Sequence, residues 1–447
     1  MASDDINKLL EQLESLASSP PKDPKLQRRL YDAAQKLSLA VEAPLDTVYR
    51  VIYSVRHISP AVHTEVEADQ LKFLKPMLLS SAQTATYMKT FSTLAEKGTP
   101  CTVAELTEPT GADVVFTARI LRFLASHGLV SEVSEDTFEA NRLTKTLSVN
   151  GYRAGMNQTF HMIAPAVIKA PEFFKDTSFQ NPDNVVKTPF QLVNNTDRPA
   201  FEWAHQHRPD LVAEFGLWMT ALRGRTTWLD VLDFEALIKT NGANDVAIDA
   251  ETPVFVDVGG GIGSQCALFK NKLPNLPGRV ILQDLHIVIQ HALPTEGVEN
   301  TAHDFWGEQP VKGARAYYLR TVLHDYPDQK CLAILKNIVT AMGPDSYILI
   351  DDIIVPDTGA HPRTTEMDYI MMTTLAAMER TRKQWDHLLS AAGLEVVKRV
   401  TYLEDTAESI QVVVPKGRVE ASASSVCSEA YAHTLSVLPL LNANQLP

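Results

Sequence analysis

The second half of the chain alternates apolar runs with segments of helical pattern, and this alternation restricts the fold more than any other feature. Four runs rich in β-branched residues lie between residues 253 and 355: VFVDVGG, GRVILQDL, ARAYYLRTVL and SYILIDDIIV. Apolar strands separated by helices predict a doubly wound, mostly parallel sheet with helices on both faces. We therefore expect an α/β fold that binds its ligands beyond the carboxyl ends of the strands.

The first half of the chain is predicted to be mainly helical. Residues 6–16 place Ile6, Leu9, Leu10, Leu13 and Leu16 on one helical face. This stripe either packs on its own domain or forms a seam between two subunits. Residues 102–147 follow the order helix, turn, helix, hairpin, which is typical of a winged helix. The segment carries seven acidic and four basic residues. Because that balance is unfavourable for phosphate contacts, we expect a packing or dimerisation role and no nucleic acid.

A glycine-rich turn follows the first apolar run, in the segment VFVDVGGGIGSQCALF. Gly259, Gly261 and Gly263 allow the backbone to turn sharply and to approach a ligand closely. A dinucleotide fingerprint needs a further glycine or alanine, but Ser264 and Cys266 occupy the two possible positions. The turn therefore predicts a nucleotide-type ligand other than a dinucleotide.

Two acidic residues accompany this turn. Asp257 stands at the end of the preceding strand, where a carboxylate suits a cationic group such as the ammonium of an amino acid. Asp284 closes the next strand, 21 residues after Gly263, where it can accept hydrogen bonds from both hydroxyls of a ribose. Together with the glycines, these acids predict a ligand of the adenosine type.

Six motifs over residues 254–393 carry a family resemblance: DVGGGIG, QDL, HDF, LRTVLHDYPD, IDDIIVP and MERTRKQW. In this order they resemble the class I S-adenosylmethionine-dependent O-methyltransferases of the plant caffeate and flavonoid type, and their fungal relatives in secondary metabolism. The resemblance covers about residues 70–417. It implies a Rossmann-like catalytic domain that binds S-adenosyl-L-methionine and methylates a hydroxyl of a small aromatic or polyketide-type metabolite.

The resemblance also implies a division of the chain. It gives a helical, winged-helix-like region for dimerisation and substrate closure over 70–225. The helical pattern of residues 1–69, which the resemblance does not cover, predicts an N-terminal helical extension. The cofactor-binding catalytic domain follows over 226–417, and residues 418–447 form a tail. The apolar stripe of residues 6–16 and the acidic winged-helix segment together predict a homodimer, with residues 1–100 forming much of the contact.

The resemblance assigns roles to individual residues. The glycine turn faces the methionine part of the cofactor, and Asp284 faces the ribose. Asp304 and Phe305 match the pair that brackets the adenine. Arg320 stands where a lysine near the cofactor is usual and retains the positive charge.

The catalytic group implied by the resemblance is a base with two acids. His324 matches the general base, Asp352 matches a first orienting acid for which glutamate is commoner, and Glu379 matches the second. Met371, Met372 and Trp385 fall in segments that border the substrate pocket or pack against it. The competing interpretation of His324 is a polar residue at a junction between a strand and a helix.

The chemistry of methyl transfer agrees with such a group. The sulfonium is already activated, so the protein mainly has to align a nucleophile with it. Moving a proton from a phenol of pKa about 10 to an imidazole of pKa about 6.5 is uphill by roughly 5 kcal/mol. A nearby carboxylate raises the basicity of the imidazole and fixes its tautomer.

A second function on the same fold stays open. A cyclase could bind the same cofactor and close a ring on a polyketide–amino acid product, and His161 in the segment GMNQTFHMIAP could serve it. Otherwise, His161 is a packing residue or a contact with the substrate. The presence of His324, Asp352 and Glu379 together favours methyl transfer.

Composition excludes several other classes of function. A net charge of −13 disfavours binding to nucleic acid or to an anionic membrane. Four scattered cysteines without a CxxC pair indicate neither a disulfide framework nor a metal site. The chain opens without a signal-peptide pattern and lacks an apolar run of spanning length, so we expect a cytoplasmic protein.

Overall fold

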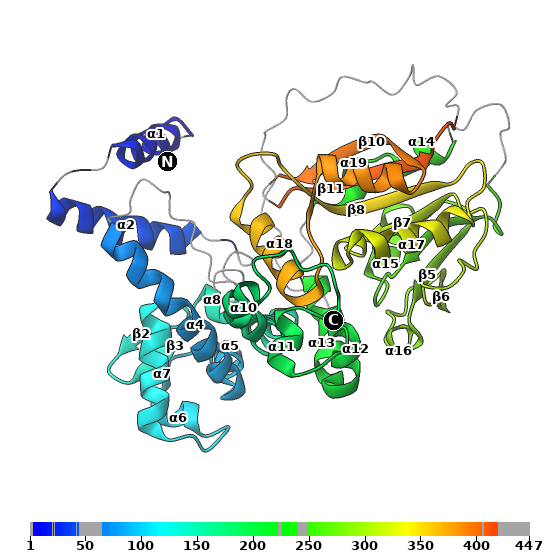
Figure 1. Ribbon diagram of the computed structural model, residues 1–447. Helices are drawn as coiled ribbons and strands as arrows, with labels where there is room; N and C mark the ends of the chain where they lie inside the picture. The colour runs from blue at the N-terminus through cyan, green and yellow to red at the C-terminus, as the bar shows by residue number, and fades with distance from the viewer. Residues whose placement is uncertain are drawn as a thin grey trace.

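The computed structural model describes residues 3–19, 21, 23–41, 43, 65–221, 226–239, 248–404 and 406–418. Figure 1 shows a helical region, coloured cyan to green, beside an α/β region that ends in red. All but the first residue of the predicted tail 418–447 lies outside the described residues.

The α/β region is built on one sheet of mixed direction. Its strands are β4 (Pro253–Val258), β5 (Arg279–Asp284), β6 (Val298–Ala302), β7 (Ala316–Arg320), β8 (Tyr347–Val355), β10 (Leu394–Leu403) and β11 (Glu408–Pro415). Their order is β10-β11-β8-β7-β4-β5-β6, and the short β9 (Arg380–Thr381) pairs with the end of β8. The strands from β4 to β8 run parallel, whereas β11 is antiparallel to both of its neighbours. The predicted doubly wound α/β fold is confirmed.

Helices cover both faces of this sheet. They are α14 (Phe234–Lys239), α15 (Ser264–Lys272), α16 (His286–Ile289), α17 (Asp328–Val339) and α19 (Arg382–Ala391), whereas α18 (Pro362–Leu375) packs mainly on helices that precede residue 221. Val256 and Tyr317 belong to the apolar cluster that includes α17 and α19. Their chain neighbours Phe255 and Tyr318 belong to the cluster that includes α14 and α15. This alternation follows the two-residue period of a strand and buries the sheet on both faces.

The helical region begins with α4 and continues to residue 221. Its elements are α4 (Glu65–Tyr87), α5 (Thr90–Lys97), β1 (Cys101–Thr102), α6 (Val103–Thr107), α7 (Val114–Ser126), β2 (Ser131–Ser134), β3 (Thr137–Glu139), α8 (Arg142–Ser148), α9 (Asn150–Gln158), the π-helix η2 (Thr159–Ile163), α10 (Ala164–Asp176), α11 (Pro189–Asn194), α12 (Ala200–His207) and α13 (Pro209–Ala221). The predicted order of helix, turn, helix and hairpin over 102–147 is present. Gly128 at φ 74° follows α7, and Asp136 at φ 49° forms the hairpin turn.

Helix α13 connects the helical region to the glycine turn of the α/β region. A Cβ built on Gly155 of α9 would lie 2.3 Å from Trp218, so this glycine permits close packing of α9 on α13. A Cβ built on Gly216 of α13 would lie 3.0 Å from Ile262, a residue of the glycine turn. The hydroxyls of Thr220 and Ser264 are 3.1 Å apart in the same contact.

The N-terminal helices α1 (Ser3–Ser18) and α2 (Pro24–Val41) precede this arrangement and lie away from the sheet in Figure 1. Leu9, Leu10, Leu13 and Leu16 of α1 are 37–51% exposed. The predicted stripe is therefore not covered by the described part of the chain. In that same part, no helix combines the length and the apolar character needed to cross a membrane.

Candidate active site

His324 lies in the short 3₁₀-helix η4 (Leu323–Asp325), which follows the carboxyl end of β7. The side chain is buried, its Nδ1 is 2.7 Å from Glu379 Oε1, and its Nε2 is 3.4 Å from Asp325 Oδ1. Burial opposes protonation of the imidazole, but the carboxylates of Glu379 and Asp325 outweigh it and raise the pKa of His324 to about 10. The residue is therefore part of a buried acid–base group rather than an isolated residue at a junction.

Glu379 is held in place from two elements. It lies between α18 and β9, and its backbone N–H donates to Asp368 Oδ1 of α18 at 2.9 Å. The residue is 4% exposed and its side chain is fully buried, so the carboxylate meets His324 away from solvent. In the neutral imidazole, a carboxylate on Nδ1 fixes the tautomer that carries hydrogen there, so Nε2 is the nitrogen that accepts a proton.

Asp352 lies in β8 close to this pair but does not hydrogen-bond with it. The residue is 1% exposed, and neither carboxylate oxygen has a hydrogen-bond partner among the described residues. Burial raises the pKa of Asp352 well above its ordinary range; the charge of His324 acts in the opposite direction, and that of Glu379 adds to the increase. Of the two acids expected to orient His324, only Glu379 contacts it in this structure, and the catalytic role of Asp352 stays a prediction.

The glycine turn has the geometry expected of a ligand-binding loop. Gly259, Gly261 and Gly263 have φ values of 70°, 62° and 86°, which favour glycine. Asp284, at the end of β5, accepts hydrogen bonds from the N–H groups of Gly261 at 2.8 Å and Leu285 at 2.7 Å. Burial raises the pKa of Asp284 to about 6, against the effect of these two hydrogen bonds.

The surroundings of the turn distinguish its open side from its packed side. A Cβ built on Gly261 would meet no heavy atom within 4 Å, so this position faces open space that a ligand can fill. A Cβ built on Gly259 would lie 3.4 Å from the ring of Phe305, which places that ring beside the turn. Asp257 is buried beneath the turn, where a Cβ on Gly260 would lie 2.5 Å from its carboxyl carbon. The contact of Asp257 with a ligand ammonium, expected from the sequence, stays a prediction.

Phe305 also marks an aromatic group that the sequence did not single out. Its ring lies 5.1 Å from that of Trp306 and 5.9 Å from that of Tyr326. The neighbouring Asp304 accepts a hydrogen bond from the N–H of Trp306 at 3.1 Å. Tyr326 could have been recognised as an aromatic residue two positions after the candidate base.

Arg320, which the family resemblance places near the cofactor, makes its hydrogen bonds to side chains of the sheet. Its guanidinium donates to Asp351 at 2.6 Å, to the Tyr402 hydroxyl at 2.7 Å and to Glu408 at 2.8 Å. The side chain is 15% exposed. It therefore stabilises the ends of β7, β8 and β11, and a contact with the cofactor stays a prediction.

The candidate substrate residues lie on η2 and α18. His161 Nε2 is 2.8 Å from the hydroxyl of Tyr87, and burial lowers the pKa of His161. Met371 is buried and Met372 partly buried, and the cluster around Met371 includes Ile163 of η2. Helix α18 packs against both η2 and η4, so one helix contacts the elements that carry His161 and His324. Trp385, in contrast, is a core residue whose Nε1–H donates to Ile353 O at 3.1 Å.

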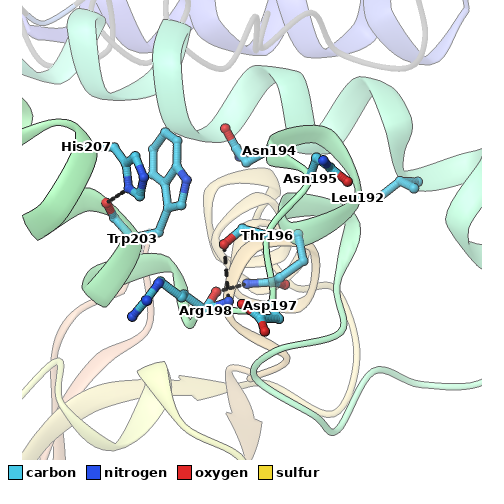
Figure 2. Close-up of a pocket in the computed structure, with 9 residues that line it drawn as sticks. Leu192, Asn194, Asn195, Thr196, Asp197, Arg198, Trp203 and His207 are labelled. Atoms are coloured by element: carbon cyan, nitrogen blue, oxygen red, sulfur yellow. Dashed lines mark hydrogen bonds between the residues drawn. The ribbon is translucent and has the colours of Figure 1, made fainter.

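A separate hollow of about 660 Å³ lies at the loop between α11 and α12 (Figure 2). It is lined by Gln191, Leu192, Asn194, Asn195, Thr196, Asp197, Arg198, Trp203 and His207. The rings of Trp203 and His207 stack at 5.1 Å on one side of it. The candidate base, its acids and the glycine turn do not line this hollow.

Comparison with known proteins identifies the family. Residues 237–395 match the O-methyltransferase domain, and residues 70–150 match the O-methyltransferase dimerisation domain. Demethylsterigmatocystin 6-O-methyltransferase of Aspergillus flavus is 35% identical over 342 residues, which cover 76% of this chain and 86% of the relative. The chain belongs to the O-methyltransferase family.

Solved structures of similar proteins agree with this assignment. One titled "A Pericyclic Reaction enzyme" is 30% identical, with a TM-score of 0.74 over 93% of this chain and 100% of that one. OxaC in complex with SAH and oxaline is 25% identical, with a TM-score of 0.68 over 86% of this chain and 100% of that one. This O-methyltransferase uses S-adenosylmethionine, and the open side of its glycine turn, next to Asp284 and Phe305, fits such a ligand.

Proposed function

We propose that His324 is the general base that removes a proton from a substrate hydroxyl during methyl transfer. The observation that carries the proposal is the buried 2.7 Å contact between His324 Nδ1 and Glu379 Oε1 in a chain of this family. Glu379 raises the basicity of the imidazole and leaves Nε2 as the proton acceptor. Bound S-adenosylmethionine supplies an activated methyl group on its sulfonium.

The residues around the glycine turn are proposed to hold the cofactor. Asp284 would accept hydrogen bonds from the ribose hydroxyls, and Phe305 with Asp304 would flank the adenine. Gly261 would allow the backbone to approach the methionine part. The φ values of the turn and the space at Gly261 support this arrangement.

The proposed substrate is a small aromatic or polyketide-type metabolite with a free hydroxyl. The names of the fungal relatives support this class, since they include demethylsterigmatocystin 6-O-methyltransferase and 16-O-methyltransferase bsc6. His161, Met371 and Met372 are the proposed contacts with the substrate. The domain boundaries expected from the sequence are retained in this proposal.

A cofactor-assisted cyclase is the second candidate. It is supported by the similarity to a structure titled as a pericyclic reaction enzyme and by His161 on η2. The alternative covers both dehydration and pericyclic ring closure. Methyl transfer is the better proposal because the His324–Glu379 pair supplies the proton acceptor that a hydroxyl needs and the named relatives are O-methyltransferases.

The proposed assembly is a cytoplasmic homodimer that binds neither nucleic acid nor membranes. The match to a dimerisation domain and the exposed leucines of α1 support the dimer, and the acidic net charge supports the absence of polyanionic partners.

The function is tested by incubating the protein with methyl-labelled S-adenosylmethionine and fractionated fungal metabolite extracts. We expect label in a phenolic or enolic product, with one demethylated cofactor formed per product. Turnover of a metabolite without transfer of label would instead support the cyclase.

A further inference from the structure

Arg380 follows Glu379 in the chain and is fully buried, although arginine is rarely buried without a specific role. It lies on β9, beside the end of β8, and contacts the loop that carries His324. We propose that Arg380 is a positioning residue that fixes the His324 loop against Glu379. This inference rests on the proposed role of His324 as the base.

The contacts of Arg380 enclose the loop on both sides of His324. Nη1 donates to Leu323 O at 2.9 Å, and Nη2 donates to Tyr326 O at 2.8 Å. Nε and Nη2 also donate to Asp328 Oδ1 at 2.9 and 2.8 Å. One guanidinium therefore joins the residue before His324, the loop after it and the first turn of α17.

The guanidinium itself is held by the core. Its central carbon lies 5.3 Å from the centre of the Trp385 ring, and Trp385 is in turn fixed to β8 through Ile353 O. A planar group with donors in fixed directions is suited to three acceptors that face it from different elements. The thiol of Cys331 also lies 3.1 Å from Leu323 O, but it is a weak donor.

The consequence is that two adjacent residues anchor both members of the acid–base pair. Glu379 provides the carboxylate, and Arg380 holds the backbone on which the imidazole is mounted. A shift of about 1 Å at such a site can cost about 100-fold in rate. Loss of the guanidinium should therefore reduce turnover while leaving the glycine turn intact.

The test compares Arg380→Lys with the matched variant Arg399→Lys in the full-length protein. A lysine keeps the charge but cannot reach Leu323 O, Tyr326 O and Asp328 together. We expect R380K to lower kcat roughly 10–100-fold and to leave the affinity for S-adenosylhomocysteine within about twofold. R399K makes the same exchange at an arginine of β10 whose acceptors, Gln411 and Asp386, lie outside the His324 loop, so kcat should change less than about threefold.

A second measurement separates positioning from general destabilisation. In R380K the contact between His324 and Glu379 loosens, so the pKa of His324, followed by NMR of labelled histidine, should fall by about one unit. The rising limb of the pH–rate profile should move to lower pH in parallel. Methylguanidinium added to R380A should recover part of kcat.

The proposal is overturned if R380K has wild-type kcat per S-adenosylhomocysteine-binding site, or if its kcat falls with no change in the pKa of His324. The NMR titration does not depend on catalysis. It therefore remains informative even if the His324→Ala variant shows that His324 is not the base.

Discussion

At the scale of single residues, the site is defined by charges that solvent does not reach. His324 and Glu379 form a buried pair, with Asp325 and Asp352 close by. His324 and Glu379 could be identified from the sequence because they lie in motifs of the family. The sequence could not show that Glu379, and not Asp352, meets the imidazole, because that depends on side-chain length and on the path between α18 and β9. The role of Arg380 was also not predicted, because its acceptors lie about 50 residues away in the chain.

Glu379→Gln tests the origin of the raised pKa of His324. Removing the negative charge should lower this pKa from about 10 toward its ordinary value and should reduce kcat at the optimum. NMR titration of labelled histidine in the cofactor-free protein measures the first effect. An unchanged pKa of His324 in E379Q would show that the carboxylate of Glu379 does not cause the increase.

The same pair predicts how stability depends on pH. Folding raises the pKa of His324, so protonated His324 stabilises the folded state through its carboxylate partners. This contribution to the free energy of unfolding is fully present below pH 6.5 and is lost as pH rises through about 10. The difference in unfolding free energy between wild type and E379Q should therefore be larger at pH 6 than at pH 10. Urea denaturation at the two pH values measures it, and an equal difference at both would contradict the account.

Gly261→Val tests the open side of the glycine turn, with Gly313→Val as its matched control. The two glycines have φ values of 62° and 64°, and a Cβ on either would meet no atom within 4 Å. Both variants should therefore carry similar backbone strain. Calorimetry should show loss of S-adenosylhomocysteine binding in G261V only. Equal loss in both variants would mean that strain, and not blocked space, is responsible.

At the scale of elements, the four predicted strands β4, β5, β7 and β8 were recognisable because burial on both faces produces continuous apolar runs. The other strands of this sheet, β6, β9, β10 and β11, were not predicted. β9 has only two residues, and β11 (ESIQVVVP) is buried but carries polar residues among its apolar ones. β6 (VENTA) is a largely exposed edge strand, and β10 (LEVVKRVTYL) carries charged residues on its exposed face. The contact between α13 and the glycine turn was also beyond prediction, since it joins two regions with no shared motif.

Gly216→Ala tests whether α13 supports the cofactor loop. Replacing a helical glycine with alanine should favour the helix by up to about 1 kcal/mol. The added Cβ would lie 3.0 Å from Ile262, so the glycine turn must shift by a few tenths of an ångström. We expect affinity for S-adenosylhomocysteine to fall by about tenfold while thermal stability is unchanged or higher. If affinity is unchanged, α13 does not position the turn.

At the scale of the whole molecule, the exposed face of α1 calls for a partner surface that the described chain does not supply. Four leucines of this helix are 37–51% exposed. In a homodimer these leucines would be buried. Residues 70–150, which match the dimerisation domain, would form a further part of the subunit interface.

Light scattering should therefore give the mass of a dimer at micromolar concentration. Leu9→Glu combined with Leu13→Glu should weaken the dimer. Val397→Glu on β10, at a residue that is 38% exposed and lies outside the dimerisation match, serves as a comparison. A monomer mass for the wild-type protein at this concentration would contradict the proposed assembly.

The central claim is that His324 accepts the proton of a hydroxyl that becomes methylated, and the most direct measurement is label transfer by wild type and His324→Ala across a range of pH. We predict that wild type moves the labelled methyl group into product in step with formation of the demethylated cofactor. H324A should bind the cofactor normally, turn over roughly 10²–10⁴-fold more slowly, and recover activity as pH rises, because hydroxide then supplies the phenolate. Product that forms without loss of the methyl group, or an H324A variant as active as wild type at neutral pH, would contradict the claim.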